Sequence, residues 1–370
     1  MIILEQNAII IGIGLIYQKN IKVHSETEII RRNSMSNEFG IDLGTANLLV
    51  YVKGKGIIIN EPSVLAVNTK TGDVVAIGEE ARKMIGRTPG NITIIRPLKN
   101  GVIADFQSTA AMLKYFVSKT KKYVTGLFPT KPSLVICTPC GVTQVERRAI
   151  QESALKSGAK EVFIVEEPLA AAIGANLPVS EAVGSMVVDI GGGTTEVAVL
   201  SLGGIVTSQS LRIGGDAQNF AIMEYIRKKH NLLIGEKTAE QIKFELGSAW
   251  EPELGKGFDV RGRDMVTGLP ATVEITTEEI YDSLKEPVQQ ILDVVKLTLE
   301  SCPPELSGDI MEHGIVLTGG GSLLKNMDTF IEKATNIPVR IAENPLDCVA
   351  IGTGKTLDNL SIFRSNKKAK

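Results

Sequence analysis

The same hairpin pattern occurs twice in this chain, and this duplication restricts the fold more than any other feature of the sequence. Residues 38–59 and 185–206 each start with an apolar run, pass through an aspartate into glycine, and end in alternating apolar residues. Asp42 of the first copy aligns with Asp189 of the second. Alternation with a period of two predicts two strands joined by a glycine-rich turn in each copy. We therefore expect two related halves built on one plan.

Both turns have the composition of a phosphate-binding loop. Glycine lets backbone N–H groups approach phosphate oxygens, and it permits a tight turn. The aspartate suits a hydrated cation, because Mg²⁺ keeps most of its waters in proteins. One such turn alone is as often an ordinary hairpin, so the second copy decides the interpretation. Two facing hairpins would hold one triphosphate between them, each with backbone amides and one carboxylate.

A third glycine cluster, at residues 314–322, follows another apolar strand and precedes a helical pattern. We expect it at a helix N-terminus, beside the adenosine or the α-phosphate. It lacks the lysine of the P-loop motif G-x-x-x-x-G-K-[ST]. It also does not fit the G-x-G-x-x-G fingerprint of dinucleotide-binding folds.

Together, the three clusters resemble those of the superfamily that contains actin, heat-shock chaperones and sugar kinases. Within it, the chain is most similar to the MreB family of bacterial actins, over residues 38–358. The matching segments include IDLGTANLLVYVKGKGIIINEPSV, RPLKNGVIADF, EEPLAAAIGANLP, MVVDIGGGTTEVAVLSLGGIV, LLIGEKTAEQIK and GIVLTGGGSLL. The resemblance implies an α/β, actin-like ATPase fold with two duplicated α/β domains, each carrying a smaller inserted subdomain. ATP and Mg²⁺ are expected in the central cleft.

The resemblance also divides the chain into segments. Residues 1–35 precede the match and are interpreted as an N-terminal extension. We favour an upstream start codon before Met35, and the alternative is a segment that touches the membrane. Its apolar stretch is shorter than the ~20 residues that span a bilayer. The expected subdomains are IA at residues 36–60, 104–178 and 346–370, IB at 61–103, IIA at 179–211 and 278–345, and IIB at 212–277.

Glu167 is the predicted catalytic residue. It stands between an expected strand at residues 162–165 and Pro168, and proline suits the first position of a helix. A carboxylate at such a corner can orient water for attack on the γ-phosphate, and simple capping of the helix is the alternative. The resemblance favours catalysis, and it assigns Thr194 to the same water.

The resemblance implies a larger set of nucleotide contacts. Glu240 and Lys243 lie one turn apart on an expected helix, where a surface ion pair is the alternative to a grip on ribose and base. Asp42 and Asp189 are expected to hold Mg²⁺ through water. Residues 42–52 contain no lysine, so backbone amides and Mg²⁺ must neutralise most of the phosphate charge. The predicted contacts are Asp42, Gly44, Thr45, Ala46, Asn47, Asp189, Gly191, Gly192, Gly193, Thr195, Gly215, Asp216, Glu240, Lys243, Gly319, Gly320 and Gly321.

Composition excludes several other functions. The 370 residues have 43% hydrophobic and 22% charged side chains, as in a soluble globular protein. A formal net charge of −2 gives no electrostatic case for nucleic-acid binding. Cys137 and Cys140 form a lone C-x-x-C, which fits a buried strand end followed by a turn better than a metal site. The three histidines are isolated, so neither a zinc site nor a histidine-based triad is indicated.

Leu127 and Phe128 form an apolar pair in a loop bounded by glycine and proline, with lysines at positions 119, 121, 122 and 131. Such a pair can insert at an anionic membrane surface, and burial in the core is the alternative. The resemblance favours insertion, because a loop here carries a membrane-entering hydrophobic pair in the MreB family.

The predicted function is that of an ATP-dependent cytoskeletal protein that maintains bacterial cell shape. It would polymerise head to tail into paired filaments in the cytoplasm, on the inner face of the cell membrane. The expected partners are further copies of the chain, anionic inner-membrane lipid and proteins of the elongation complex. A chaperone-type ATPase would need a C-terminal substrate domain, and a sugar kinase would need a substrate-side aspartate base. The sequence offers a clear candidate for neither.

Overall fold

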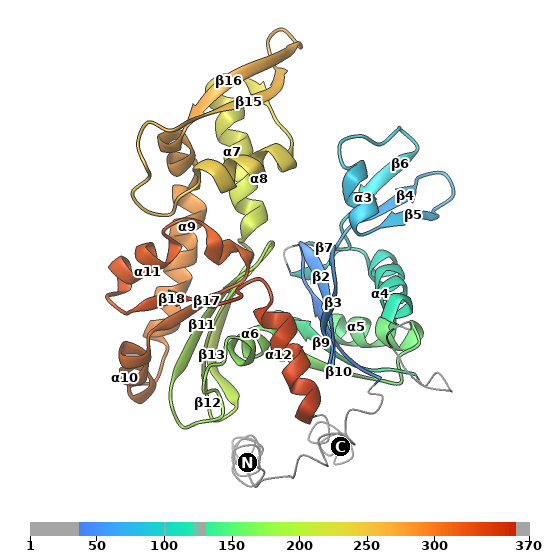
Figure 1. The fold of residues 1–370 in the computed structure, drawn as a ribbon, viewed down its shortest axis with the longest axis vertical. Coiled ribbons are helices and arrows are strands. Elements are labelled where there is room, and N and C mark those ends of the chain that lie inside the picture. Colours follow the sequence, from blue (N-terminus) through green and yellow to red (C-terminus); the bar gives the residue numbers. More distant parts are fainter. Residues whose placement is uncertain (1–36, 100, 121–122, 124–130, 360–370) are drawn as a thin grey trace.

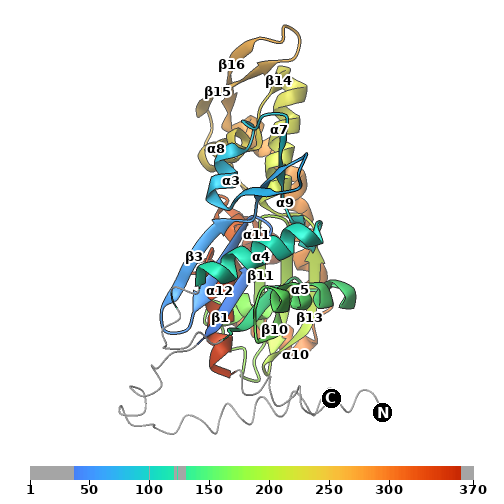
Figure 2. The ribbon, with the colours of Figure 1, turned by 90° about the vertical axis from the view of Figure 1, so that its right-hand side faces the viewer.

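The computed structural model of the chain describes residues 37–99, 101–120, 123 and 131–359. Two lobes lie side by side, each with a five-stranded sheet and a smaller three-stranded sheet (Figure 1). Both smaller sheets project from the same end of the molecule (Figures 1 and 2). The two five-stranded sheets therefore lie next to each other, and the two three-stranded sheets are separate at one end of the molecule.

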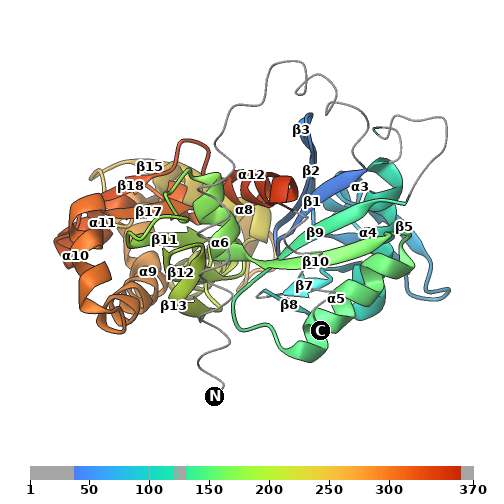
Figure 3. The ribbon, with the colours of Figure 1, turned by 90° about the horizontal axis from the view of Figure 1, so that it is seen from below.

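The first lobe is built on a sheet of strand order β10-β9-β1-β2-β3. Strand β1 is antiparallel to β2 and parallel to β9. Helices α4 and α5 cover one face and contribute Phe116 and Ile150 to the core (Figure 3). The bounds are β1 Glu38–Leu43, β2 Asn47–Val52, β3 Gly56–Pro62, β9 Ser133–Thr138, β10 Glu161–Glu166, α4 Phe106–Thr120 and α5 Gln144–Lys156.

The second lobe repeats this plan with the order β13-β12-β11-β17-β18. Strands β11 and β12 are buried along their whole length, which explains their nearly continuous apolar sequence. Helix α9 packs against them with one apolar side. The bounds are β11 Ser185–Ile190, β12 Thr195–Ser201, β13 Gly204–Leu211, β17 Ile315–Thr318, β18 Val339–Ile341, α9 Thr277–Glu300, α10 Pro304–His313 and α11 Met327–Thr335.

The strand registers match the repeat found in the sequence. Ile41 pairs with Val50 in the first hairpin, and Val188 pairs with Val197 in the second. These are equivalent positions of the two sequence copies, so the same side chains face the same way in both lobes. The predicted duplication and the α/β class are confirmed.

The small sheets are insertions into the two lobes. Sheet β5-β4-β6 follows the first hairpin, and sheet β14-β15-β16 follows the second. They lie within the ranges predicted for subdomains IB and IIB, and the exact division into four subdomains stays a prediction. The bounds are β4 Leu65–Asn68, β5 Val74–Ile77, α3 Glu79–Met84, β6 Ile92–Ile95, β7 Leu98–Lys99, β8 Val102–Ile103, α7 Gly215–His230, β14 Leu232–Leu233, α8 Glu236–Leu246, β15 Gly257–Asp264 and β16 Pro270–Thr276.

Helices α6 (Glu167–Gly174) and α12 (Cys348–Thr356) cross between the lobes at backbone contact (Figure 3). A Cβ atom on Gly174 would lie 1.8 Å from the carbonyl oxygen of Cys348. A Cβ atom on Gly352 would lie 1.8 Å from the carbonyl oxygen of Ala170. Since a backbone oxygen cannot rotate away, glycine at both positions is required for this crossing. The Lys355 ammonium adds a hydrogen bond of 3.2 Å to the carbonyl oxygen of Ile173.

Replacing Gly174 by alanine should force the two helices apart. We expect Gly174→Ala to lower the free energy of unfolding by about 2 kcal/mol or more, as overpacking of a tight contact does. Gly308→Ala is the matched control, because Gly308 is also in a helix but has no atom within 4 Å of its added Cβ. That control should be neutral or stabilise the protein by up to about 1 kcal/mol. Urea unfolding of both variants measures the difference, and equal effects would contradict the contact.

Candidate functional site

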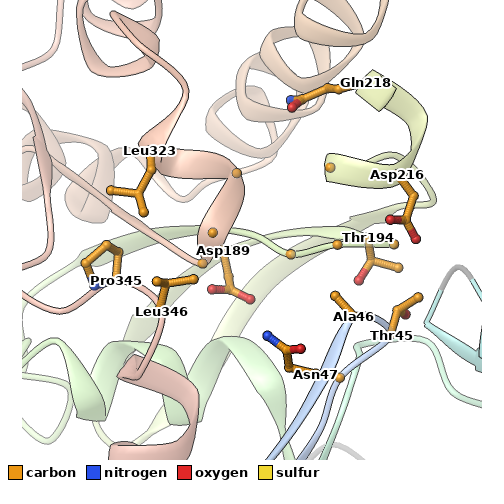
Figure 4. A pocket seen from close by; sticks show the side chains of 18 of the residues that line it. Thr45, Ala46, Asn47, Asp189, Thr194, Asp216, Gln218, Leu323, Pro345 and Leu346 are labelled. Atoms are coloured by element: carbon orange, nitrogen blue, oxygen red, sulfur yellow. The ribbon is translucent and has the colours of Figure 1, made fainter. Parts of the chain in front are cut away.

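A cavity of about 410 Å³ lies between the lobes, below the two small sheets. Its wall comes from both glycine-rich hairpins, the third glycine cluster, and helices α6, α7 and α8. Figure 4 shows Asp189, Thr194 and Asp216 on one side and Ala46 and Asn47 on the other. A volume of this size suits a ligand as large as a nucleotide.

The two hairpin turns face each other at short range. A Cβ atom on Gly192 would lie 2.7 Å from the Cβ of Ala46, and one on Gly193 would lie 2.7 Å from Thr45 Oγ1. Glycine in the second turn thus sets how closely the first turn approaches it. This is the arrangement that the duplication predicts for loops on both sides of a phosphate chain.

Three carboxylates line the cavity: Asp42 and Asp189 are buried, and Glu167 is half-buried. Burial, and then repulsion from Asp189, raises the pKa of Asp42 to about 7. Burial raises the pKa of Asp189 to about 6, against a hydrogen bond from Thr318. Burial, and then the charges of Asp189 and Asp42, raises the pKa of Glu167 well above its ordinary value. A cation between these groups would relieve both the repulsion and the loss of hydration.

The donor set fits a hydrated Mg²⁺. Asp42 and Asp189 supply hard oxygen atoms from opposite lobes, which Mg²⁺ prefers. Within the described residues, no group of three or more His, Cys, Asp or Glu side chains is placed to hold a metal ion directly. A cation that keeps its waters and contacts the protein through them needs no such group.

Glu167 is the first residue of α6, directly before Pro168. The strand β10 ends at Glu166, so the chain turns from sheet to helix at this carboxylate, as the sequence predicts. Thr194 ends the second glycine turn and also lines the cavity. Both side chains predicted to hold the attacking water are therefore on its wall.

The third glycine cluster differs from its expected structure. A single 3-10 turn, η2 (Gly320–Leu323), follows the strand, and the next α-helix begins only at Met327. Gly319 has a φ of 76°, a left-handed conformation that glycine adopts without strain. The Thr318 hydroxyl donates to Asp189 Oδ1 at 2.6 Å and so orients that carboxylate. The cluster reaches the cavity as a turn rather than as a helix N-terminus.

The upper part of the cavity combines polar and apolar groups. Lys243 Nζ donates to the carbonyl oxygen of Gly215 at 3.0 Å, and burial lowers the pKa of Lys243. Phe244, Leu323 and Leu346 add an apolar wall that the sequence analysis missed. They come from three separate parts of the chain, and only the position of Phe244 next to the predicted contact Lys243 could have indicated one of them.

All predicted nucleotide contacts except Thr195 line the cavity. Thr195 is fully buried, and its hydroxyl donates to the carbonyl oxygen of Ile213 at 2.8 Å. The physical reason is strand alternation, since successive side chains of an extended chain point to opposite sides. Thr194 faces the cavity, so its neighbour cannot. Leu127 and Phe128 lie outside the described residues.

In the part of the chain that the structure describes, no helix has the length and apolar character needed to cross a membrane.

The family model and the similar curated proteins all indicate the same family. A family model described as MreB/Mbl protein matches residues 36–365. The chain is 52% identical over 332 residues to the cell shape-determining protein Mbl of Bacillus subtilis (strain 168), covering 90% of this chain and 99% of that protein. It is 53% identical over 335 residues to the cell shape-determining protein MreB of Escherichia coli (strain K12), covering 90% and 96%.

Solved structures agree with the sequence matches. MreB5 of Spiroplasma citri bound to ADP has a TM-score of 0.84 and 39% identity, covering 89% of this chain and 98% of that chain. A MamK double helical filament has a TM-score of 0.73, covering 87% and 98%. At 20% identity the second match concerns the fold alone.

The buried carboxylates predict how stability depends on pH when nucleotide and Mg²⁺ are absent. The pKa of Asp42 is about 7 in the folded chain, against about 3.9 for an unfolded aspartate. The folded state therefore binds this proton more tightly, and the stabilisation is complete below the unfolded value and lost as pH rises toward 7. Melting temperature should fall from about pH 4 to pH 7 and then level off. Asp42→Asn should weaken that fall and melt higher at pH 8; a lower melting temperature there would contradict it.

Proposed function

This chain belongs to the MreB/Mbl family and has the actin-like fold of its structural neighbours, and from this premise we propose that it is a Mg²⁺-dependent ATPase whose hydrolysis drives the turnover of shape-maintaining filaments. The observation that carries the proposal is the pair of facing glycine turns, each with one buried aspartate, around a nucleotide-sized cavity. The solved relatives bound to ADP and to AMPPNP support a nucleotide in that cavity.

Hydrolysis here depends mainly on positioning and charge stabilisation, which is what phosphoryl transfer requires. Mg²⁺, when bound with ATP, neutralises phosphate charge and orients the triphosphate. Asp42 and Asp189 would hold its waters, and backbone amides of the glycine turns would donate to phosphate oxygens. Thr194 and Glu167 would orient the attacking water, with Glu167 accepting its proton.

The base and the ribose would occupy the upper part of the cavity. Glu240 and Lys243 come from α8, and Gly215 and Asp216 from the first turn of α7. Phe244 of α8, Leu323 of the η2 turn and Leu346 add apolar groups to the lining of the same cavity. An apolar slot closed by a few polar groups is the usual form of a site for a flat base.

The same comparisons support self-association. A neighbour of the same fold is a double helical filament by name, and the curated relatives are cell shape-determining proteins. We propose head-to-tail polymers of this chain, arranged as paired protofilaments, with elongation-complex proteins as further partners. A chaperone or a sugar kinase of this fold remains the second candidate, which no described observation favours.

The role of Glu167 can be tested by a change that keeps its shape. Glu167→Gln should lower the rate of ATP hydrolysis by about 10²–10⁴-fold, because the amide cannot accept the proton of the attacking water. ATP affinity in Mg²⁺ should change little. Glu166→Gln is the matched control, since that exposed neighbour pairs with Arg147 at 3.6 Å on the surface. Phosphate release assays on both variants decide, and normal release by Glu167→Gln would sink the assignment.

Membrane binding is proposed for the loop that contains Leu127 and Phe128, from the sequence and the family. Lys55 is a further basic residue next to this segment, because its Nζ donates to the carbonyl oxygen of Tyr123 at 2.8 Å. Lys119, one of the lysines counted in the sequence, is instead engaged with a protein carboxylate, because its ammonium pairs with Glu61 at 2.5 Å. The surface proposed to meet anionic lipid on the inner face of the membrane is therefore this loop together with Lys55.

Replacing Leu127 and Phe128 by serine should abolish co-sedimentation with anionic liposomes and leave ATP hydrolysis intact. Full insertion of both side chains would stabilise the bound state by roughly 3–5 kcal/mol, and repetition along a filament multiplies the weak contact. Lys55→Gln should have a milder effect that disappears at high salt. Liposome binding by the double variant would place the anchor elsewhere, with residues 1–20 the first segment to test.

A further inference from the structure

Gly101, which the mechanism above does not use, contacts a threonine from each of the two facing hairpin turns. It lies in the turn between β7 and β8, directly before Val102. Its backbone N–H donates to Thr45 Oγ1 at 3.1 Å. A Cβ atom built on Gly101 would lie 2.6 Å from Thr194 Cγ2. Figure 4 shows the two threonines at the same end of the cavity, and both line it.

The hairpin that carries Gly101 is attached to the core of the first lobe. Leu98 on β7 is 3% exposed and belongs to that core. It pairs with Ile103 on β8, which packs against the same core. The carbonyl oxygen of Pro97 accepts the N–H of Ala104 at 2.8 Å and so closes the hairpin at its base. The position of Gly101 is therefore set by the packing of the whole lobe.

Two separate constraints require glycine at position 101. Its φ of 73° lies in the left-handed region, which residues with a Cβ adopt only at a cost. The space that a Cβ would need is also occupied, by Thr194 Cγ2 and by Pro139 Cγ at 3.1 Å. The backbone of Gly101 and the methyl group of Thr194 are thus packed directly against each other.

This contact decides which way Thr194 presents its hydroxyl. The Cβ position on Gly101 is 2.6 Å from the Thr194 methyl carbon and 3.6 Å from Thr194 Oγ1, so the methyl group faces the hairpin. Methyl and hydroxyl share one Cβ, and a β-branched side chain has few stable χ1 positions. Holding the methyl group against Gly101 therefore leaves the hydroxyl for the cavity that Thr194 lines.

The same glycine orients the second threonine by a hydrogen bond. A hydroxyl group has one hydrogen and two lone pairs. The N–H of Gly101 occupies a lone pair of Thr45 Oγ1, so the hydrogen of that hydroxyl stays available to another acceptor. Gly193 of the other lobe also approaches this hydroxyl, because its Cβ would lie 2.7 Å from Thr45 Oγ1. A phosphate oxygen held between the two turns would be an acceptor of the right kind.

We propose that Gly101 is a positioning residue for hydrolysis, which directs the Thr194 hydroxyl to the attacking water and the Thr45 hydroxyl to the phosphate. It acts through these two side chains and not on the substrate itself. The proposal rests on the ATPase function proposed above and extends the site to a hairpin outside the glycine turns. Hydrolysis should therefore depend on the fit between position 101 and the side chain at position 194.

Steady-state ATP hydrolysis at saturating Mg²⁺-ATP tests this fit in two backgrounds. In the otherwise unsubstituted chain, Gly101→Ala should lower kcat by about tenfold or more, because the added methyl group displaces the Thr194 side chain. Thr194→Ser removes the methyl group of residue 194 and keeps its hydroxyl. In that background, Gly101→Ala should change kcat by less than about twofold, since the two groups that collide are no longer both present.

Gly72→Ala is the matched control. Gly72 is likewise a turn glycine of a hairpin, between β4 and β5, and its φ of 75° matches that of Gly101. A Cβ on Gly72 would have no atom within 4 Å. Gly72→Ala thus adds the same backbone strain without the contact, and it should leave kcat unchanged.

Thr194→Ser alone gives a second test, which does not depend on the folding of Gly101→Ala. Without the methyl contact its hydroxyl can rotate, so kcat should fall several-fold while the melting temperature changes little. Unchanged kcat in Gly101→Ala, equal losses from this change in both backgrounds, or full kcat in Thr194→Ser would overturn the proposal. Hydrolysis that needs Glu167 but is insensitive to position 101 rejects this inference alone. Absence of hydrolysis by the unsubstituted chain rejects the ATPase proposal as well.

Discussion

The lobes meet over acidic side chains that repel one another, and the arrangement of the site depends on this unfavourable contact. Asp42 comes from the first lobe and Asp189 from the second, and each is almost completely buried. Packing alone would favour apolar residues at such a junction. The chain instead keeps two carboxylates, and a bound cation would relieve the repulsion between them. Stability of the closed lobes is thereby linked to the ligand, since anything that binds the folded state alone stabilises it.

Helix α6 connects this charge cluster with the crossing of the lobes. Its first residue is Glu167 and its last is Gly174, so a helix of 8 residues joins the proposed catalytic carboxylate to the contact with α12. A helix this short moves as one body. Glu167 therefore cannot shift relative to α12 without disturbing a backbone contact that has no space to spare. The position of Glu167 and the close contact between the two helices therefore depend on the same short helix.

The sequence predicted the parts of this structure that repeat or that carry charge. The two hairpins with equal spacing predicted the duplicated sheets, because alternating apolar residues are typical of a strand with one buried face. The sequence did not predict the apolar wall of the cavity, since Phe244, Leu323 and Leu346 come together only in the folded chain. Thr195 was included among the nucleotide contacts because the motif was carried over whole, without its alternation, and its side chain is buried away from the cavity. Gly101 lies in one of the matching segments, but its contact with Thr194 exists only in the folded chain.

The crossing of α6 and α12 also has a consequence at the level of the gene. Glycine codons differ from one another only in the third base, so a change in the first two bases of the Gly174 or Gly352 codon either ends the chain or replaces glycine by a residue with a side chain. Each such side chain meets a carbonyl oxygen of the facing helix. Variation at these two codons is therefore confined to the silent third base unless the partner helix moves as well.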